Sequence, residues 1–327
     1  MPTLASRRSR QLPIDVADLP APLDAAPSDP PVQHVRAALD LRLRALLHHD
    51  PGTRSGADIE DLHQMRVAVR RMRAALKAAR PLLDSAWADG LRAELGWLGR
   101  ALGPVRDLDV MLLRLRGEIA SLPERERAAG GVLVDTLEGE HRSARAQMLA
   151  ALDAPRYTAL LERLADAIRL PLPTPSATRA QPELVDLVRA EAYRMRRAVE
   201  KAGEDPPDAV LHELRILGKR VRYTGELVAP GLRTQERHGR SEAGQGRAVK
   251  RLLAATAQLQ EVLGDHQDAC VAEQRIRELL DGLGELPDAH VVFVAGRLVE
   301  RERARAEHKR AEWPSAWTQV ADRIADL

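Results

Sequence analysis

Residues 62–77 limit the possible folds of this chain more than any other stretch, because they join an apolar helix face to an uninterrupted row of cations. At 3.6 residues per turn, two stripes lie side by side on one helix. The apolar stripe is typical of a face packed on a core. Like charges on one helix face repel, so the cationic stripe predicts a bound anion. The apolar stripe is Met65, Val69, Met72 and Leu76, and the cationic stripe is His63, Arg66, Arg70, Arg73 and Lys77.

The pattern occurs a second time, in residues 211–223. There the cationic stripe consists of His212, Arg215, Lys219 and Arg222, and Glu226 takes the place of Lys77. A second pair of similar segments, 101–107 and 262–268, follows each basic helix in the same order. Two ordered matches predict an internal duplication.

Composition and periodicity predict an all-α fold. Hydrophobic residues make up 44% of the chain and aromatic residues 2%, so a core would consist mainly of Leu, Ala and Val, which suits packed helices. We find no strand pattern. Proline and glycine should punctuate the helices: Pro51 should end the first helix, and Pro104 should end or kink the third. Helices are expected near 32–49, 57–80, 85–102, 104–115, 124–152, 156–170, 183–203, 207–228, 247–263, 265–283, 289–310 and 313–325.

The expected organisation is a disordered tail followed by two similar halves. Residues 1–31 are rich in proline and lack a helical period, which is typical of disorder. Residues 32–170 and 183–327 would each form a helical bundle, joined by a proline-rich linker at 171–182. The two bundles are expected to be pseudo-symmetric and to bring both cationic stripes to one shared basic groove.

Charge and cysteine content exclude several classes of function. The chain has 50 basic and 48 acidic residues, so its cations are segregated locally. Scarce aromatic residues disfavour a single-stranded nucleic-acid site, which usually stacks bases on aromatic rings. The single cysteine, Cys270, excludes an internal disulfide and a cysteine-based zinc site, and it is compatible with the cytoplasm. No apolar run approaches the ~20 residues that span a bilayer, and no signal peptide is recognised.

Four ordered motifs resemble those of the CHAD family, the conserved histidine α-helical domain. They are His63-x-x-Arg66 and His212-x-x-Arg215 with their following cations, and the segments 102–109 and 263–268. The resemblance implies two four-helix bundles related by pseudo-symmetry and a basic groove that binds inorganic polyphosphate without catalysis or a cofactor. It also implies association with polyphosphate granules. The implied polyphosphate-binding residues are His63, Arg66, Arg70, Arg71, Arg73, Lys77, Arg106, His212, Arg215, Lys219, Arg220, Arg222 and Tyr223.

Other interpretations of these residues stay open. Surface arginines often form structural ion pairs, and both stripe histidines could be packing or capping residues. Asp107 and Asp268 are expected to support nearby arginines through charge-assisted hydrogen bonds. A metal-dependent phosphohydrolase is an alternative, because Asp265 and Asp268 could converge on one helix face, although no metal site is expected. Nucleic-acid binding is a third interpretation. The oligomeric state cannot be read from the sequence.

Overall fold

The computed structural model describes residues 14–26, 29–175, 183–232 and 242–327. These residues form helices and no strand, which confirms the all-α prediction. The elements are η1 (Val16–Asp18), α1 (Pro31–Ser55), α2 (Ile59–Ala78), η2 (Arg80–Leu82), α3 (Ser85–Ala120), α4 (Glu124–Leu152), α5 (Pro155–Arg169), α6 (Leu184–Ala202), α7 (Asp208–Leu232), α8 (Glu242–Asp281) and α9 (Ala289–Ala325). None of these helices is long and apolar enough to cross a membrane.

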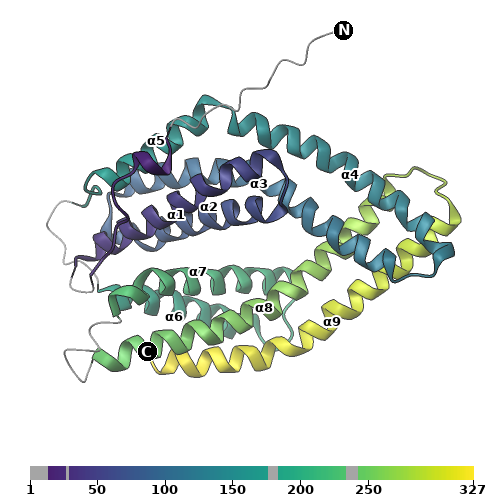
Figure 1. The fold of residues 1–327 in the computed structure, drawn as a ribbon. Coiled ribbons are helices and arrows are strands. Elements are labelled where there is room, and N and C mark those ends of the chain that lie inside the picture. Colours follow the sequence, from purple (N-terminus) through teal and green to yellow (C-terminus); the bar gives the residue numbers. More distant parts are fainter. Residues whose placement is uncertain (1–13, 27–28, 176–182, 233–241) are drawn as a thin grey trace, which may run out of the picture.

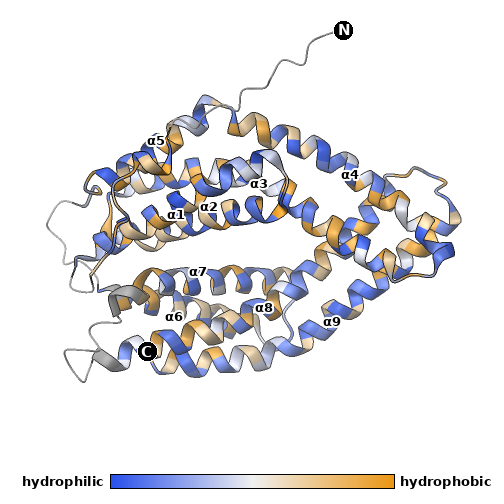
Figure 2. Cartoon of the chain, in the orientation of Figure 1, coloured by the Kyte–Doolittle hydropathy of each residue, from blue (hydrophilic) through white to orange (hydrophobic). Residues whose placement is uncertain are grey.

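The helices form two layers that join at one end (Figure 1). Helices α1, α2 and α5 lie in one layer with the first part of α3. Helices α6 and α7 lie in the other, with the first part of α8 and the last part of α9. Each layer has its own buried core, and apolar residues concentrate on the helix sides that face other helices (Figure 2).

A third core joins the two layers at the far end. The last turns of α3 and the first turns of α4 pack there against the matching parts of α8 and α9. Leu115 and Leu133 come from one half of the chain, and Ile276 and Val294 come from the other. The two halves on either side of residues 171–182 therefore form different layers, but residues of both halves build the third core. Residues 176–182 of the expected linker lie outside the described residues.

Several helices are longer than the sequence predicts. Helix α1 passes through Pro51 and ends at Gly56, whose φ of 70° suits glycine. Helix α3 passes through Pro104 and α9 through Pro314. All three prolines are exposed, so water can satisfy the backbone carbonyl that loses its hydrogen-bond donor. The break expected between residues 263 and 265 is also absent, because α8 is continuous there.

The expected disordered tail is ordered over part of its length. Ile14 and Leu19 are buried in the core of the first layer, and the backbone N–H of Leu23 donates to Asp40 Oδ2 at 2.8 Å. Residues 14–26 therefore make contacts with the first layer. Residues 1–13 and 27–28 lie outside the described residues.

The apolar stripe of the first basic helix is buried as predicted. Asp58 caps α2 by accepting a hydrogen bond from the Glu60 N–H at 2.8 Å. All four apolar residues of the stripe are buried. Helix α7 buries Leu214, Val221 and Val228 in the second layer in the same manner. Packing these faces into two different layers fixes the rotation of each basic helix and so determines where its cations point.

Candidate anion-binding groove

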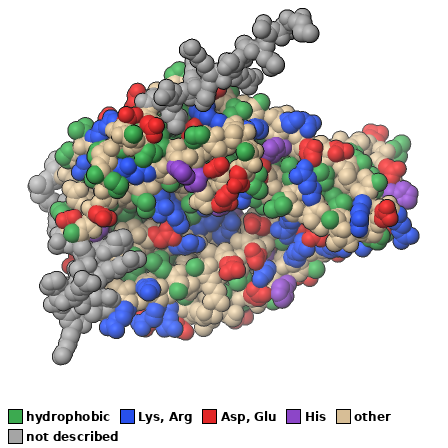
Figure 3. All heavy atoms as spheres, viewed as in Figure 1, with side chains coloured by type: hydrophobic (Ala, Val, Ile, Leu, Met, Phe, Trp, Pro, Cys, Tyr) green, Lys and Arg blue, Asp and Glu red, His purple; other side chains and the backbone are tan. Residues whose placement is uncertain are grey.

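Helices α2 and α7 are neighbours, although α2 belongs to one layer and α7 to the other. A pocket of about 250 Å³ lies between them. Figure 3 shows Lys and Arg side chains gathered in the recess between the two layers. Of the charged residues that line the pocket, six are cations and one is an acid. The cations are Arg70, Arg73 and Lys77 on α2, Arg92 on α3, and Lys219 and Arg220 on α7, and the acid is Glu191 on α6.

The lowered pKa of Lys219 indicates that the two cationic stripes lie close to each other. Its pKa is lowered to about 8, first by burial and then by Arg215 on the same helix and Arg70 on α2. Asp268 opposes these effects only in part. Burial likewise lowers the pKa of Lys77 on α2, with Arg220 of α7 as the next cause. Each helix therefore places cations against those of the other, across a site that disfavours positive charge until an anion enters.

Each basic helix carries an arginine that contacts an acid of the same half of the chain. Arg66 Nη1 donates to the Gly103 carbonyl oxygen at 2.6 Å and to Asp107 Oδ1 at 2.9 Å. In the other half, Arg215 Nη2 lies 3.8 Å from Asp268 Oδ1. Both acids of the expected supporting pair thus contact the arginine of their own half. The Asp107 contact is a charge-assisted hydrogen bond, whereas the Asp268 contact is an ion pair that is too long for one.

The two stripe histidines sit in different surroundings. Burial lowers the pKa of His63, and Arg106 is the next cause. Glu60 opposes this lowering, and Arg70 and Arg66 add smaller effects in the same direction as Arg106. His212 Nδ1 is buried and has no hydrogen-bond partner among the described residues. His212 Nδ1 therefore lacks the hydrogen bond that a buried polar atom usually makes.

Two of the expected binding residues point to a different partner. Arg222 Nε donates to Glu226 Oε1 at 3.0 Å, and Arg71 Nε lies 3.3 Å from Glu226 Oε2. Glu226 thus ties α2 to α7 and partly neutralises both arginines. Tyr223 lies between this ion pair and the groove, since it lines both pockets there, and the Arg70 guanidinium sits 6.0 Å from its ring centre.

Three charged residues of the groove were not identified from the sequence. Burial is the main cause of the lowered pKa of Arg73, and the nearby cations Arg92 and Arg100 on α3 lower it further. Glu191 on α6 contributes the acid that lines the pocket. None of the three belongs to a repeated stripe. Their position depends on how α3 and α6 pack beside the basic helices, and no sequence period records that packing.

The acids of the hydrolase alternative lie beside the groove. Asp265 and Asp268 line a separate pocket of about 450 Å³ with Lys309 and Arg305. Asp265 Oδ2 is 3.6 Å from Lys309 Nζ, and Asp268 faces Arg215. Each carboxylate therefore has a cation as its neighbour, which disfavours their joint use as ligands for a catalytic metal.

Comparisons with known proteins identify a family for this chain. The CHAD domain family profile matches residues 37–277. Two uncharacterized proteins from two strains of Mycobacterium tuberculosis are each 28% identical over 301 residues, which cover 88% of this chain and 53% of theirs. The chain thus spans about half the length of these relatives.

Solved structures of similar fold come from a bacterium and a plant. PptA from Streptomyces chartreusis aligns with a TM-score of 0.69 at 22% identity, covering 88% of this chain and 98% of that one. The CHAD domain from the plant Ricinus communis aligns with a TM-score of 0.62 at 26% identity, covering 96% and 97%.

Proposed function

Because the chain belongs to the CHAD domain family, we propose that its central groove is a binding site for inorganic polyphosphate. The proposal joins the ligand that the family resemblance implies to the cations that two distant helices bring together. Binding without turnover is the proposed activity.

The approach of the two cationic stripes is the observation that carries this proposal. Lys219 is crowded by cations from its own helix and from α2, and the described lining of the pocket holds six cations against one acid. Such crowding costs free energy in the unliganded protein. A polyanion would remove that cost and would accept bidentate hydrogen bonds from the guanidinium groups.

The length of the stripes favours a chain over a single phosphate. His63 and Lys77 are fourteen residues apart in the sequence, which corresponds to about 21 Å along a helix. A lone orthophosphate would contact only a fraction of this row. A linear polyanion could neutralise cations along the whole row and release their counterions together, as nucleic acids do.

The remaining residues receive supporting roles in this proposal. His63 and His212 would donate to phosphate oxygens at one end of the groove. Asp107 and Asp268 would orient Arg66 and Arg215. Arg106, placed beside His63, would extend the cationic surface past the end of the stripe.

Equilibrium binding of long-chain polyphosphate to the purified chain tests the proposal. One variant carries Arg70→Glu with Arg73→Glu, and a second carries Lys219→Glu with Arg220→Glu. The control carries Arg125→Glu with Arg142→Glu, which reverses two highly exposed cations on α4. Circular dichroism should show that all of them remain helical.

We expect each groove variant to bind at least tenfold more weakly than the wild type, and the control to keep most of its affinity. Orthophosphate and single-stranded DNA should compete poorly. If both groove variants bind as well as the control, the groove is not the site. Magnesium-dependent shortening of the polyphosphate that is lost in Asp265→Ala would instead favour the hydrolase.

A further inference from the structure

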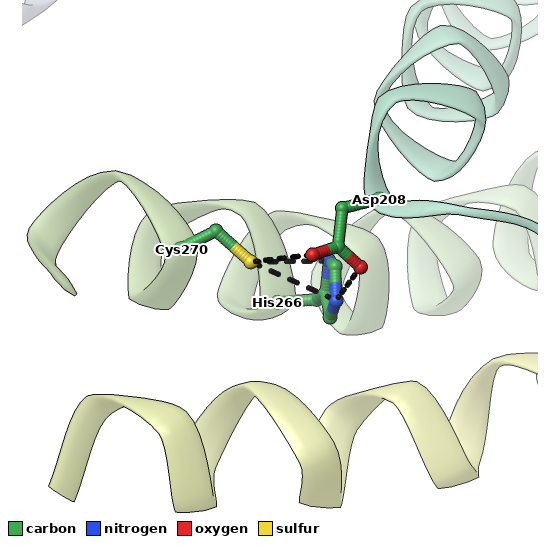
Figure 4. A group of neighbouring side chains, drawn as sticks. All are labelled: Asp208, His266 and Cys270. Carbon is green, nitrogen blue, oxygen red and sulfur yellow. Dashed lines mark hydrogen bonds and ion pairs between the residues drawn. The ribbon is translucent and has the colours of Figure 1, made fainter. Parts of the chain in front are cut away.

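We propose that Asp208, His266 and Cys270 form a binding site for one divalent metal ion of the zinc class. The three side chains point toward one another at the place where the first residue of α7 meets α8 (Figure 4). His266 and Cys270 are one turn apart on α8, and Asp208 comes from α7. The site lies outside the polyphosphate groove, and its assignment does not depend on the proposed function.

The distances among the three side chains suit a tetrahedral ion. His266 Nε2 lies 3.3 Å from Asp208 Oδ1. Cys270 Sγ lies 3.8 Å from Asp208 Oδ2 and 3.8 Å from His266 Nε2. Zinc bonds of about 2.0–2.3 Å at tetrahedral angles place ligand atoms about 3.3–3.7 Å apart. Only a small adjustment of side chains would therefore bring all three atoms into the coordination sphere.

The surroundings resemble those of a site that keeps one open position. The imidazole is 2% exposed, whereas the Asp208 side chain is 59% exposed. The three residues line a pocket of about 500 Å³, so an ion could enter and retain a water as its fourth ligand. Arg310 Nη1 donates to Asp208 Oδ1 at 2.7 Å. This contact holds the carboxylate in place, as outer-shell partners of metal ligands do.

The chemistry of the donor set selects the class of ion. A thiol, an imidazole and a carboxylate together suit zinc and similar borderline ions better than magnesium or calcium, which prefer oxygen ligands alone. Among the described residues, this is the one group of three or more His, Cys, Asp or Glu side chains placed closely enough to share an ion.

The proposed site accounts for three side chains that lie close together in the structure, although Asp208 is far from the other two in the sequence. A single cysteine excludes a zinc site made of cysteines alone, but it leaves open a mixed site in which the cysteine joins a histidine and an aspartate. Asp208 is separated from His266 by much of two helices, so the sequence does not show that they meet. An ion there would tie the N-terminus of α7 to α8, one turn before His212. It would stabilise the folded chain, because an ion that binds the folded state alone raises its stability.

Metal titration of the full chain, first stripped with a chelator, tests this inference. Calorimetry would follow zinc, and absorption would follow cobalt, whose bond to a thiolate produces a charge-transfer band in the near ultraviolet. We expect one tightly bound ion per chain, a thiolate–cobalt band, and a higher melting temperature with metal. Cys270→Ser should abolish the band and weaken zinc binding by about tenfold or more, since even outer-shell changes cost about 10- to 100-fold.

His308→Gln is the matched control, because His308 also pairs with a carboxylate, that of Glu312 at 3.0 Å, without a thiol nearby. It should keep the tight zinc site and the band. Asp208→Asn provides a second test at a more exposed ligand position, and it should weaken binding while circular dichroism shows that the protein stays helical. The inference is overturned if cobalt gives no thiolate band, or if Cys270→Ser binds zinc as the wild type does.

Discussion

Raising the pH through 8 should weaken polyphosphate binding, and Lys219 should account for much of the effect. In the free groove its pKa is about 8, because burial and the nearby cations Arg215, Arg70 and Arg66 outweigh the opposing effect of Asp268. A bound polyanion favours the charged ammonium and raises this pKa toward the ordinary 10.5. Binding then takes up a proton above pH 8. Affinity must be greatest below that value and must fall as the pH rises toward the pKa of the bound state.

The size of the effect follows from the two pKa values. A lysine that moves from about 8 to about 10.5 lowers affinity about tenfold between pH 7 and pH 9, and changes it little between pH 6 and pH 7. If the bound polyanion restores only half of the difference between these two pKa values, the affinity still falls about sixfold between pH 7 and pH 9. Lys77, whose pKa is also lowered, acts in the same direction. Terminal phosphates complete their ionisation near pH 6 to 7, which would strengthen binding and so cannot imitate the fall.

Fluorescence anisotropy with labelled polyphosphate at fixed ionic strength is the assay. Lys219→Arg keeps the positive charge but cannot lose it in this range, so this variant should bind with a shallower pH dependence. Adding Lys77→Arg should make the profile nearly flat between pH 7 and pH 9. The reasoning is refuted if wild-type affinity is constant over this range, or if the double variant shows the same fall as the wild type.

Three further predictions concern individual charges. Arg92→Glu should weaken polyphosphate binding by about tenfold, or about 1.4 kcal/mol, measured in the same assay; an unchanged affinity would exclude Arg92 from the site. Glu226→Gln should free two arginines and strengthen binding by no more than about fivefold, since partly exposed ion pairs contribute about 1 kcal/mol or less, whereas weaker binding would contradict a purely neutralising role. Tyr157 donates from its buried hydroxyl to Asp50 Oδ2 at 2.7 Å, so Tyr157→Phe should lower the free energy of unfolding by about 1–3 kcal/mol in urea titration; no change would show that the hydrogen bond contributes nothing.

The basic helices could be predicted because their information is local. The apolar stripe of α2 and its cations repeat at a helical period, so both the helix and the faces of its side chains follow from residues 62–77. Asp107 and Asp268 were also found, since each belongs to a short repeated segment. The structure places both beside the expected arginines.

Features that depend on packing between distant segments could not be predicted. The continuity of α3 through Pro104 depends on the exposure of that proline in the folded chain. The third core combines Leu115 with Ile276, and no local pattern shows that they meet. Arg92 enters the groove only because α3 packs against α2. Glu226 likewise forms ion pairs with Arg71 and Arg222, which the family resemblance and the repeat assign to the ligand.

The salt dependence of polyphosphate affinity tests the shared groove most directly. If a polyanion contacts cations of both basic helices, the logarithm of affinity should fall linearly with the logarithm of salt concentration, by about 0.7 per neutralised contact. The pocket lining offers five cations from α2 and α7 and a sixth from α3. Engagement of four of them gives a slope of about −3, and reversing two cations on either helix should make the slope shallower by about 1 to 1.5. A wild-type slope near −1, or a slope unaffected by reversal on one of the two helices, would contradict a groove that both halves of the chain build.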